Sequence, residues 1–571
     1  MRSLLLTAAL LAALVGASPV SAAQVTQDLS FTADDGVVLH ASIGGEGSIA
    51  RRPLIIEDSP YAPACCAAIA GPDYNYIQLQ WRGTGRSGGT FSTTGLRDQQ
   101  DLSEFVSWAC QQPWSDGRIG LYGFSASAIA IYNAMHLPLP CVRAAALMAG
   151  TVDLYRDLLY IGGVQNSAPG LYVLGAVFAP WLQNLPQRMA EQPQSVPDSL
   201  EGYATASPDV QTHPTEDAFW LDRTYKGNPA NIPVLADTGF YDVESRGPFL
   251  AYRATRDQGS HLLVIGAHDG SPAGSGGPFP HYARWFDHFV RGVDNGVDRE
   301  APVSLYLSNG SREELLAGHD THLEGSDWPL PGTRWTRLYL SAAPSGTAHS
   351  VNDGTLALGP DPSAATQTYP FHPSNALATD PHTTATVAGL GIDQLATYFP
   401  QLTRMDLAEP TSLTYTTVAL KTAVNAVGPA SLDVFASSTA PETDLVAVVA
   451  DVWPDGTAHP VATGQLRTSF PGVDLARSLT DPETGDIVEP YSDFAAKDQA
   501  LPGTSRQYHV ELPPIGNHFA AGHRIRLYVV GTSAYQQPPA PGANTLSIGG
   551  ITPSRLLLPT AQSADLAASL G

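Results

Sequence analysis

Short apolar runs alternate with segments of helical period over residues 31–290. A short apolar run bounded by turn residues is typical of a buried strand, and apolar positions three and four apart are typical of an amphipathic helix. Strand and helix in alternation favour a mostly parallel sheet covered by helices on both faces. Strands are expected in a hairpin at 31–43 and at 53–56, 76–81, 118–122, 142–148, 232–236 and 261–265, and helices at 98–111, 128–135 and 282–290.

Two parts of the chain depart from this alternation. Residues 151–230 hold many prolines and several helical fragments, so they predict an insertion over the sheet. Beyond residue 301, short alternating strands separated by Pro, Gly and Asp turns are typical of a sandwich or jelly roll. The predicted order is a signal peptide at 1–23, an α/β domain in two parts at 24–150 and 231–300 around the insertion, and a linker with a β domain at 301–571.

The first 23 residues have the pattern of a signal peptide. Arg2 precedes an apolar stretch at 4–15, and small residues at Ser21 and Ala23 suit cleavage before Gln24. The stretch is too short to span a membrane comfortably, and the sequence holds no later segment that is long and apolar enough. We therefore expect a secreted or periplasmic protein that does not bind a membrane.

Charge and cysteine content narrow the partners further. The formal net charge of −24 argues against nucleic acid and anionic membrane surfaces. Export permits disulfides among Cys65, Cys66, Cys110 and Cys141, whose pairing the sequence leaves open, as it does the number of subunits. The spacing of Cys and His residues resembles no zinc site, and we expect neither a metal nor a cofactor.

A candidate nucleophile stands at the order strand, glycine, serine and small residues. The run R-I-G-L-Y-G-F-S-A-S at 118–127 places Ser125 at the tip of a sharp turn between a strand and a helix. Ser127 replaces the second glycine of the G-x-S-x-G motif, so the run alone fits an ordinary loop as well. The neighbouring residues must decide between the two.

A nucleophilic serine needs a base and an acid that orients the base. In this architecture the acid follows a later strand and the histidine follows the next one. Asp242 follows the strand that ends near residue 238, with Asp237 as its rival. His268 follows the strand at 262–265, whereas His261 precedes it, and His281 and His288 fall in or near a helix.

Several longer motifs together resemble the CocE/NonD hydrolases, also called the X-Pro dipeptidyl-peptidase (S15) type. The loop W-R-G-T-G-R-S-G-G-T-F at 81–91 and the lead Q-P-W-S-D-G-R-I-G at 112–120 are similar to motifs of that family. So are G-F-Y-D at 239–242 and R-W-F-D-H-F at 284–289. In the last domain, W-P-D-G at 453–456 and G-H-R-I-R-L at 522–527 look like marks of the family's jelly roll.

This resemblance implies an α/β hydrolase with a helical cap insertion and a C-terminal jelly roll. It implies that Ser125 is the nucleophile, His268 the base and Asp242 its partner. The hydroxyl of Tyr61 and the backbone N–H of Ala126 would form the oxyanion hole. The sequence departs from the family pattern in two places. The family usually has an aromatic residue at the position of Ala126 and a glycine at 128. It also often has G-P-W-x-H before the base, where 266–268 reads G-A-H.

Two classes of function are compatible with these observations. The first is a secreted serine hydrolase that acts on a small ester or short peptide, and the resemblance offers X-Pro dipeptides, α-amino-acid or bulky esters, and acyl amides as substrates. The second is a catalytically silent exported binding protein on the same fold. The joint placement of the four candidate side chains favours the enzyme. An aminopeptidase would also need a buried acid for the substrate ammonium, and residues 151–230 offer many candidates, namely Asp153, Glu191, Glu201, Glu216 and Asp217.

Overall fold

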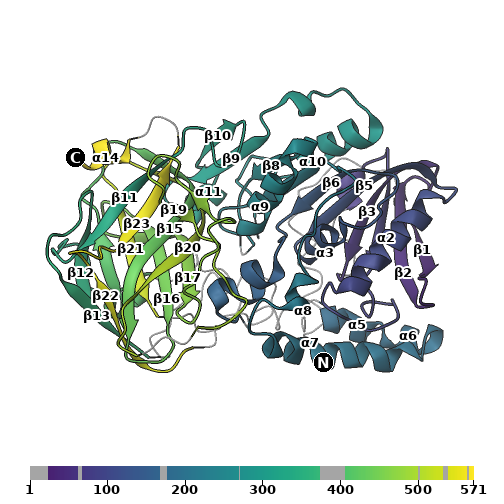
Figure 1. Cartoon of the computed structure of the whole chain (residues 1–571). Helices are drawn as coiled ribbons and strands as arrows, with labels where there is room; N and C mark the ends of the chain where they lie inside the picture. Colours follow the sequence, from purple (N-terminus) through teal and green to yellow (C-terminus); the bar gives the residue numbers. More distant parts are fainter. Residues whose placement is uncertain are drawn as a thin grey trace, which may run out of the picture.

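A computed structural model shows two large units side by side, an α/β unit and a β unit (Figure 1). It describes residues 24–61, 67–166, 177–242, 244–268, 270–372, 405–498, 502–531, 538–561 and 565–571. The expected signal peptide, Cys65 and Cys66 lie outside the described residues. Cys110 and Cys141 form a disulfide.

The α/β unit is built on a twisted sheet that is parallel except at one edge. The strands lie in the order β1, β2, β4, β3, β5, β6, β7, β8 and β9, and β1 and β2 are antiparallel to their neighbours. Their bounds are Gln24–Thr32 (β1), Val38–Glu46 (β2), Arg52–Ser59 (β3), Asn75–Gln80 (β4), Ser115–Phe124 (β5), Val142–Met148 (β6), Val234–Thr238 (β7), His261–Val264 (β8) and Val303–Ser308 (β9).

Both faces of this sheet are buried, which explains the apolar runs of the sequence. Successive side chains point to opposite faces, so Leu121 packs in the core beneath α2, α3 and α9, and Tyr122 packs in the core beneath α10. The helices of this unit are α1 (Ala67–Ala70), α2 (Leu96–Cys110), α3 (Ala126–Ala134), α9 (Arg246–Thr255), α10 (Phe279–Phe286), and the short turns η4 (Arg256–Gln258), η5 (Asp287–Arg291) and η6 (Val297–Arg299).

Between β6 and β7 the chain leaves the sheet and forms a helical segment below it (Figure 1). Its described elements are η1 (Tyr155–Leu159), η2 (Ile161–Gly163), α5 (Ala179–Gln183), α6 (Leu185–Glu191), α7 (Ser195–Thr212) and α8 (Ala218–Leu221). We call residues 151–230 the inserted segment.

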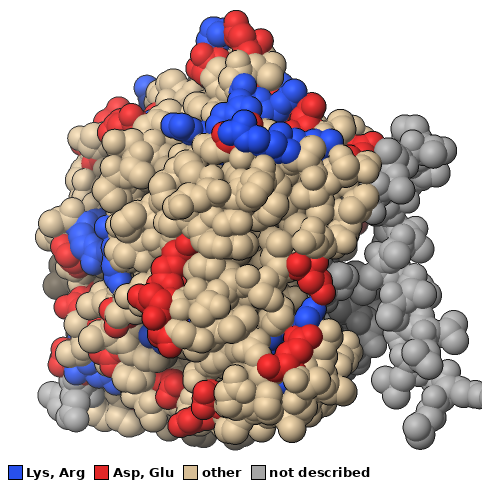
Figure 2. Space-filling view, turned by 90° about the vertical axis from the view of Figure 1, so that its right-hand side faces the viewer, with Lys and Arg blue, Asp and Glu red and all other residues tan. Residues whose placement is uncertain are grey.

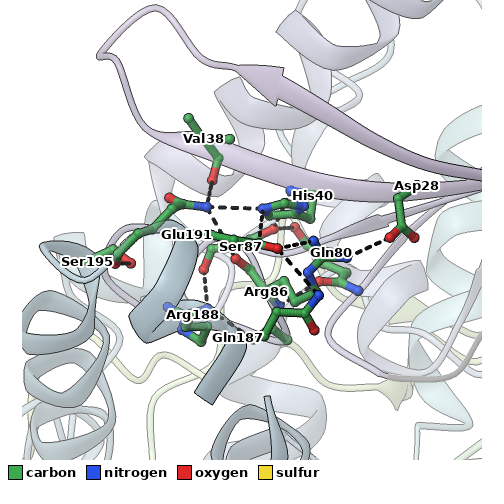
Figure 3. Close-up of polar contacts among 12 residues, drawn as sticks. Asp28, Val38, His40, Gln80, Arg86, Ser87, Gln187, Arg188, Glu191 and Ser195 are labelled. Atoms are coloured by element: carbon green, nitrogen blue, oxygen red, sulfur yellow. Dashed lines mark hydrogen bonds and ion pairs between the residues drawn. The ribbon is translucent and has the colours of Figure 1, made fainter. Parts of the chain in front are cut away.

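One arginine fastens the inserted segment to the glycine-rich loop at 82–89 (Figure 3). Arg188 of α6 is fully buried, and its Nη1 donates to the carbonyl oxygens of Thr84, Gly85 and Ser87 at 3.3, 3.0 and 2.5 Å. Its Nη2 donates to Ser199 Oγ of α7 at 2.5 Å. Burial lowers the pKa of Arg188 to about 10. The loop therefore serves as a cradle of carbonyl groups for a buried guanidinium.

The β unit begins at β9, which ends the parallel sheet and also meets β20 of the β unit at Ser308 and Asn517. Its longest pair, β15 with β20, is antiparallel, with a shift of register between Gly428 and Ala430. The further strands are β10 (Asp320–Gly325), β11 (Arg334–Ser341), β12 (Asn352–Ala357), β13 (Thr366–Phe371), β14 (Leu413–Thr416), β15 (Val424–Ser438), β16 (Asp444–Val452), β17 (Ala458–Arg467), β18 (Leu479–Thr480), β19 (Ile487–Glu489), β20 (Arg506–Phe519), β21 (Arg524–Val530), β22 (Gly542–Ser547) and β23 (Arg555–Thr560). Short helices are α11 (Arg312–Leu316), α13 (Met405–Ala408), η9 (Glu409–Thr411) and α14 (Leu566–Leu570).

The core of the β unit is shared with the inserted segment. Leu154, Tyr155 and Trp220 of that segment pack in one apolar cluster with Leu432 and Leu512 of the β unit. The β unit is therefore not packed as an independent body.

The surface carries many charges but no broad patch of one sign on the side of β1 and α6 (Figure 2). Acidic and basic side chains there form small mixed groups between uncharged areas. Among the described residues, no helix has the length and apolarity to cross a bilayer.

Candidate active site

Ser125 occupies a strained turn between β5 and α3. Its φ of 54° and ψ of −121° are unusual for a residue with a side chain, and such strain is typical of a serine held at the tip of a strand–turn–helix. The turn is crowded: a Cβ on Gly123 would lie 2.6 Å from the backbone N of Ala128. The glycine two residues before Ser125 is therefore required by space.

The two small residues that depart from the resembled pattern also have a structural account. Ala128 takes the usual place of a glycine because Gly150 faces it, and a Cβ at 150 would lie 2.5 Å from the Ala128 Cβ. Ala126 packs against an apolar cluster that includes Val177 and Phe91. The short side chain of Ala126 thus faces the inserted segment.

Ser127 and a buried carboxyl support the start of α3. Ser127 is fully buried, and its Oγ donates to Glu57 Oε1 at 3.2 Å. Glu57, at the end of β3, also accepts a hydrogen bond from the Tyr76 hydroxyl, and burial raises its pKa. The polar replacement for the second motif glycine therefore has a partner, which the sequence did not indicate.

Two hydrogen-bond donors meet beside Ser125. Tyr61 follows β3, and its backbone N donates to Ser59 Oγ at 3.2 Å. The backbone N of Ala126 lies 3.2 Å from the Tyr61 Oη and donates to it. Ala126 N also belongs to the first turn of α3, where the helix dipole favours negative charge. A carbonyl oxygen that lies beside both groups could accept from each of them in place of this contact.

The structure brings His268 and Asp242 together. His268 Nδ1 lies 3.1 Å from Asp242 Oδ1, and Asp242 Oδ1 also accepts the backbone N–H of Glu244 at 2.9 Å. The Asp242 side chain is buried, and the His268 side chain is 18% exposed. The His268 ring lies 5.1 Å from the ring of Phe124, the residue before Ser125.

The rival residues have other partners. Asp237 is buried within β7, where it accepts a hydrogen bond from the Tyr282 hydroxyl and burial raises its pKa well above the usual range. His261 lies at the start of β8 with its ring 5.1 Å from the ring of Trp285. His281 lies in the first turn of α10, and its charged neighbours include Arg284.

The acids of the inserted segment are used in ion pairs or exposed. Asp153 and Glu216 pair with Arg156, Glu191 pairs with Arg86, and Asp217 pairs with His213 and caps α8. Glu201 is exposed.

One further acid, Glu244, lies beside His268, and a second, Asp157, lies near Glu244; the sequence singled out neither. Glu244 is 1% exposed, its Oε2 has no hydrogen-bond partner, and burial raises its pKa well above the usual value of 4.5. The charges of Asp242 and Asp157 raise it further, and the His268 charge opposes them. Asp157 of η1 is paired with Arg246, Oδ1 to Nη1 at 2.7 Å. Glu244 follows Asp242 by two residues, but its burial and its unpaired oxygen could not be inferred from that spacing.

The same corner is where the described residues could hold a metal ion. One donor atom each from Asp242, Glu244 and His268 lie within 4.8 Å of one another. His268 and Asp242 also hydrogen-bond to each other, through Nδ1 and Oδ1.

Comparison with known proteins identifies the family to which this chain belongs. A model of the X-Pro dipeptidyl-peptidase (S15 family) matches residues 35–269, and one of the X-Pro dipeptidyl-peptidase C-terminal non-catalytic domain matches residues 295–562. Cocaine esterase of Rhodococcus sp. (strain MB1 Bresler) is 25% identical over 551 residues, which cover 87% of this chain and 88% of the esterase. The chain belongs to the CocE/NonD family of hydrolases.

Solved structures of other hydrolases have the same fold. A CocE/NonD family hydrolase from Staphylococcus aureus superposes with a TM-score of 0.72 at 19% identity over 94% of each chain. An α-amino acid ester hydrolase superposes with a TM-score of 0.73 at 17% identity over 96% of this chain and 98% of the other. The predicted family is confirmed, as is the α/β-hydrolase fold with a mainly parallel sheet and a C-terminal β domain. This CocE/NonD hydrolase is a serine hydrolase, and its relatives are esterases and peptidases.

Proposed function

We propose that this hydrolase cleaves a small ester or amide through a covalent acyl-enzyme on Ser125. The observation that carries the proposal is the convergence of the Ala126 N–H and the Tyr61 hydroxyl, 3.2 Å apart, at the residue next to a strained serine. The pair His268–Asp242 supplies the base and the group that orients it.

The reaction follows from these groups. As Ser125 Oγ attacks the acyl carbon, its proton passes to His268 Nε2, because Nδ1 is engaged by Asp242. The carbonyl oxygen becomes negative and accepts hydrogen bonds from Ala126 N–H and the Tyr61 hydroxyl, which stabilise the transition state more than the ground state. His268 then gives the proton to the leaving alcohol or amine. Water repeats the sequence on the acyl-enzyme and releases the acid.

Ser125→Ala tests this proposal. The variant should keep its fold and lose activity by several orders of magnitude. A fluorophosphonate probe should label the folded wild-type protein at Ser125 and leave the variant unlabelled. Full turnover by Ser125→Ala would refute Ser125 as the nucleophile. No labelling of the folded wild type would favour the catalytically silent binding protein instead.

We further propose that the acyl part of the substrate carries an amine. Glu244 is buried beside His268 with one carboxyl oxygen unpaired, which is costly unless a ligand uses it. Asp242 and Asp157 add to the negative potential there, and only Asp157 has a guanidinium partner among the described residues. An ammonium group would stabilise ionised Glu244 and gain a charge-assisted hydrogen bond. Dipeptides of the X-Pro type and α-amino-acid esters both carry such a group.

Paired substrates that differ only in the amine test the second proposal. Alanyl-prolyl p-nitroanilide and its propionyl analogue form one pair, and the p-nitrophenyl esters of alanine and propionic acid form another. We expect the substrate with the amine to have the higher kcat/KM in each pair, and this preference to disappear in Glu244→Gln. A higher kcat/KM for the anilide pair would indicate a peptidase, and a higher kcat/KM for the ester pair would indicate an esterase. Equal cleavage with and without the amine would contradict this role for Glu244 while leaving the Ser125 mechanism in place.

The remaining predictions become proposals of the same kind. We propose that the inserted segment is a cap over the site, that the β domain is a jelly roll, and that residues 1–23 are cleaved before Gln24 on export. The disulfide between Cys110 and Cys141 supports an oxidising compartment. Amino-terminal sequencing of protein recovered from an exporting host would test the cleavage site.

A further inference from the structure

A chain of buried polar side chains links the β domain to the turn that bears Asp242. Tyr241 Oη lies 3.0 Å from Ser308 Oγ, and Ser308 Oγ donates to Asn517 Oδ1 at 2.6 Å. Asn517 Nδ2 donates to Asp451 Oδ2 at 3.0 Å, and His523 Nδ1 lies 2.7 Å from Asp451 Oδ1. We call these five residues the relay.

The direction of these hydrogen bonds is fixed by the groups themselves. A serine hydroxyl has one proton. Because Ser308 gives its proton to Asn517, the Tyr241 hydroxyl is the donor to Ser308. Asn517 Oδ1 also accepts the backbone N–H of Gly310 at 3.1 Å, so both ends of the amide are used. The relay is a set of matched donors and acceptors rather than a chance cluster.

The relay joins elements that are distant in sequence. Ser308 ends β9, Asn517 is on β20, Asp451 is near the end of β16, and His523 precedes β21. Tyr241, Ser308, Asn517 and Asp451 are each at most 1% exposed. The His523 side chain is 14% exposed, so this end of the relay reaches the surface of the β domain.

Two motifs that catalysis leaves unexplained lie at that surface end. G-H-R-I-R-L at 522–527 supplies His523, and W-P-D-G at 453–456 supplies Trp453, whose ring centroid is 5.8 Å from that of His523. Trp453 also lies over His459, with ring centroids 4.3 Å apart. Both motifs therefore contribute a ring beside or at the surface end of the relay.

At the other end, Tyr241 is tied to both residues of the His–Asp pair. It directly precedes Asp242, and its backbone forms a parallel bridge with Ala267, which directly precedes His268. Phe240, one residue earlier, packs on Gly516 of β20 so closely that a Cβ at 516 would lie 2.1 Å from its ring. The backbone that carries Asp242 is therefore held against β20 by two adjacent side chains.

We propose that the relay residues are positioning residues that set the geometry of the Asp242–His268 pair from the β domain. This inference rests on the proposed function, because it assigns the relay a role only through that pair. The relay does not contact the substrate. It fixes the turn from which Asp242 orients the imidazole, and small displacements of such groups are costly, since about 1 Å can lower a rate on the order of a hundredfold.

The experiment compares two equivalent histidines in the β domain. His523 pairs with Asp451 in the relay, and His509 pairs in the same way with Asp433, Nδ1 to Oδ1 at 2.5 Å, outside the relay. His509→Gln is therefore a matched control for His523→Gln. We expect His523→Gln to lower kcat about tenfold with KM unchanged, by loosening the acid turn. His509→Gln should lower the melting temperature about as much as His523→Gln does, but leave kcat unchanged.

A second variant acts at the catalytic end and tests the route. Tyr241→Phe removes only the hydroxyl and should also lower kcat about tenfold at constant KM. In an Asp242→Asn background the same substitution should have no further effect, because effects that act through one residue are not additive. This cycle decides the question even if His523→Gln does not fold.

Three results would overturn the inference. Equal losses of kcat in the two histidine variants would show a general effect of the β domain. An undiminished effect of Tyr241→Phe in the Asp242→Asn background would show that the relay acts elsewhere. Unchanged kcat in Tyr241→Phe would show that the hydroxyl positions nothing. A separate result, full activity of Asp242→Asn alone, would contradict the proposed function and the relay together.

Discussion

Removing the hydroxyl of Tyr61 tests the oxyanion hole most directly. Tyr61→Phe keeps the ring and removes one of the two donors that meet beside Ser125. The loss of one such donor in other enzymes lowers kcat by about 10²–10³-fold, which is roughly 3–4 kcal/mol of transition-state stabilisation.

The structure places this case at the lower end of that range. Tyr61 is half-buried, so water can enter the space that the hydroxyl leaves and replace part of the lost hydrogen bond. Ala126 N–H remains as the second donor at the start of α3. We therefore expect a decrease in kcat of about a hundredfold, or about 2.7 kcal/mol. KM should change little, because the carbonyl oxygen carries no full charge before Ser125 attacks.

Steady-state kinetics with a p-nitrophenyl ester measure both constants, and thermal unfolding shows whether the variant is folded. Tyr74→Phe is a matched control. Tyr74 directly precedes β4, at the opposite end of the parallel strands from Tyr61, and its hydroxyl donates to Asp287 at 3.1 Å. An unchanged kcat with a raised KM in Tyr61→Phe would refute the reasoning. It would show that Tyr61 lines the pocket and that the second donor lies elsewhere.

Four further outcomes can be measured on the same protein. His268→Ala should abolish turnover while His281→Ala retains it, and the reverse in a kcat assay would assign the base to His281. Glu244→Gln should raise the melting temperature at pH 8 and leave it nearly unchanged at pH 4. Folding raises the pKa of Glu244, so the stability of the wild type falls as pH rises above about 4.5. A difference in melting temperature that does not depend on pH would contradict this. Arg188→Met should lower the free energy of unfolding by about 2–4 kcal/mol in a denaturant titration, because three carbonyls lose their donor, whereas a loss no larger than that of the exposed Arg256→Met would contradict the cradle. A fragment that ends at Pro329 should be insoluble in a sedimentation assay, and a soluble active fragment would show that the β domain is detachable.

The sequence predicted what depends on local order along the chain. Ser125, Asp242 and His268 each follow a strand, and parallel strands bring their carboxyl ends to one edge, so a common edge for the three residues could be expected. Glu244 could not be assigned, because burial and the absence of a partner are properties of the folded core. The ties of Arg188 to the loop at 82–89 and of Tyr241 to Ser308 join distant segments, which local periodicity does not report.

The shared core of the inserted segment and the β domain has a consequence for synthesis of the chain. Leu154, Tyr155 and Trp220 leave the ribosome long before Leu432 and Leu512, with which they pack. At ~5–20 residues per second, their apolar surfaces wait on the order of tens of seconds for a partner. The nascent protein must therefore stay soluble while these apolar side chains of the inserted segment are exposed. Any slowing of translation between the two segments lengthens that interval.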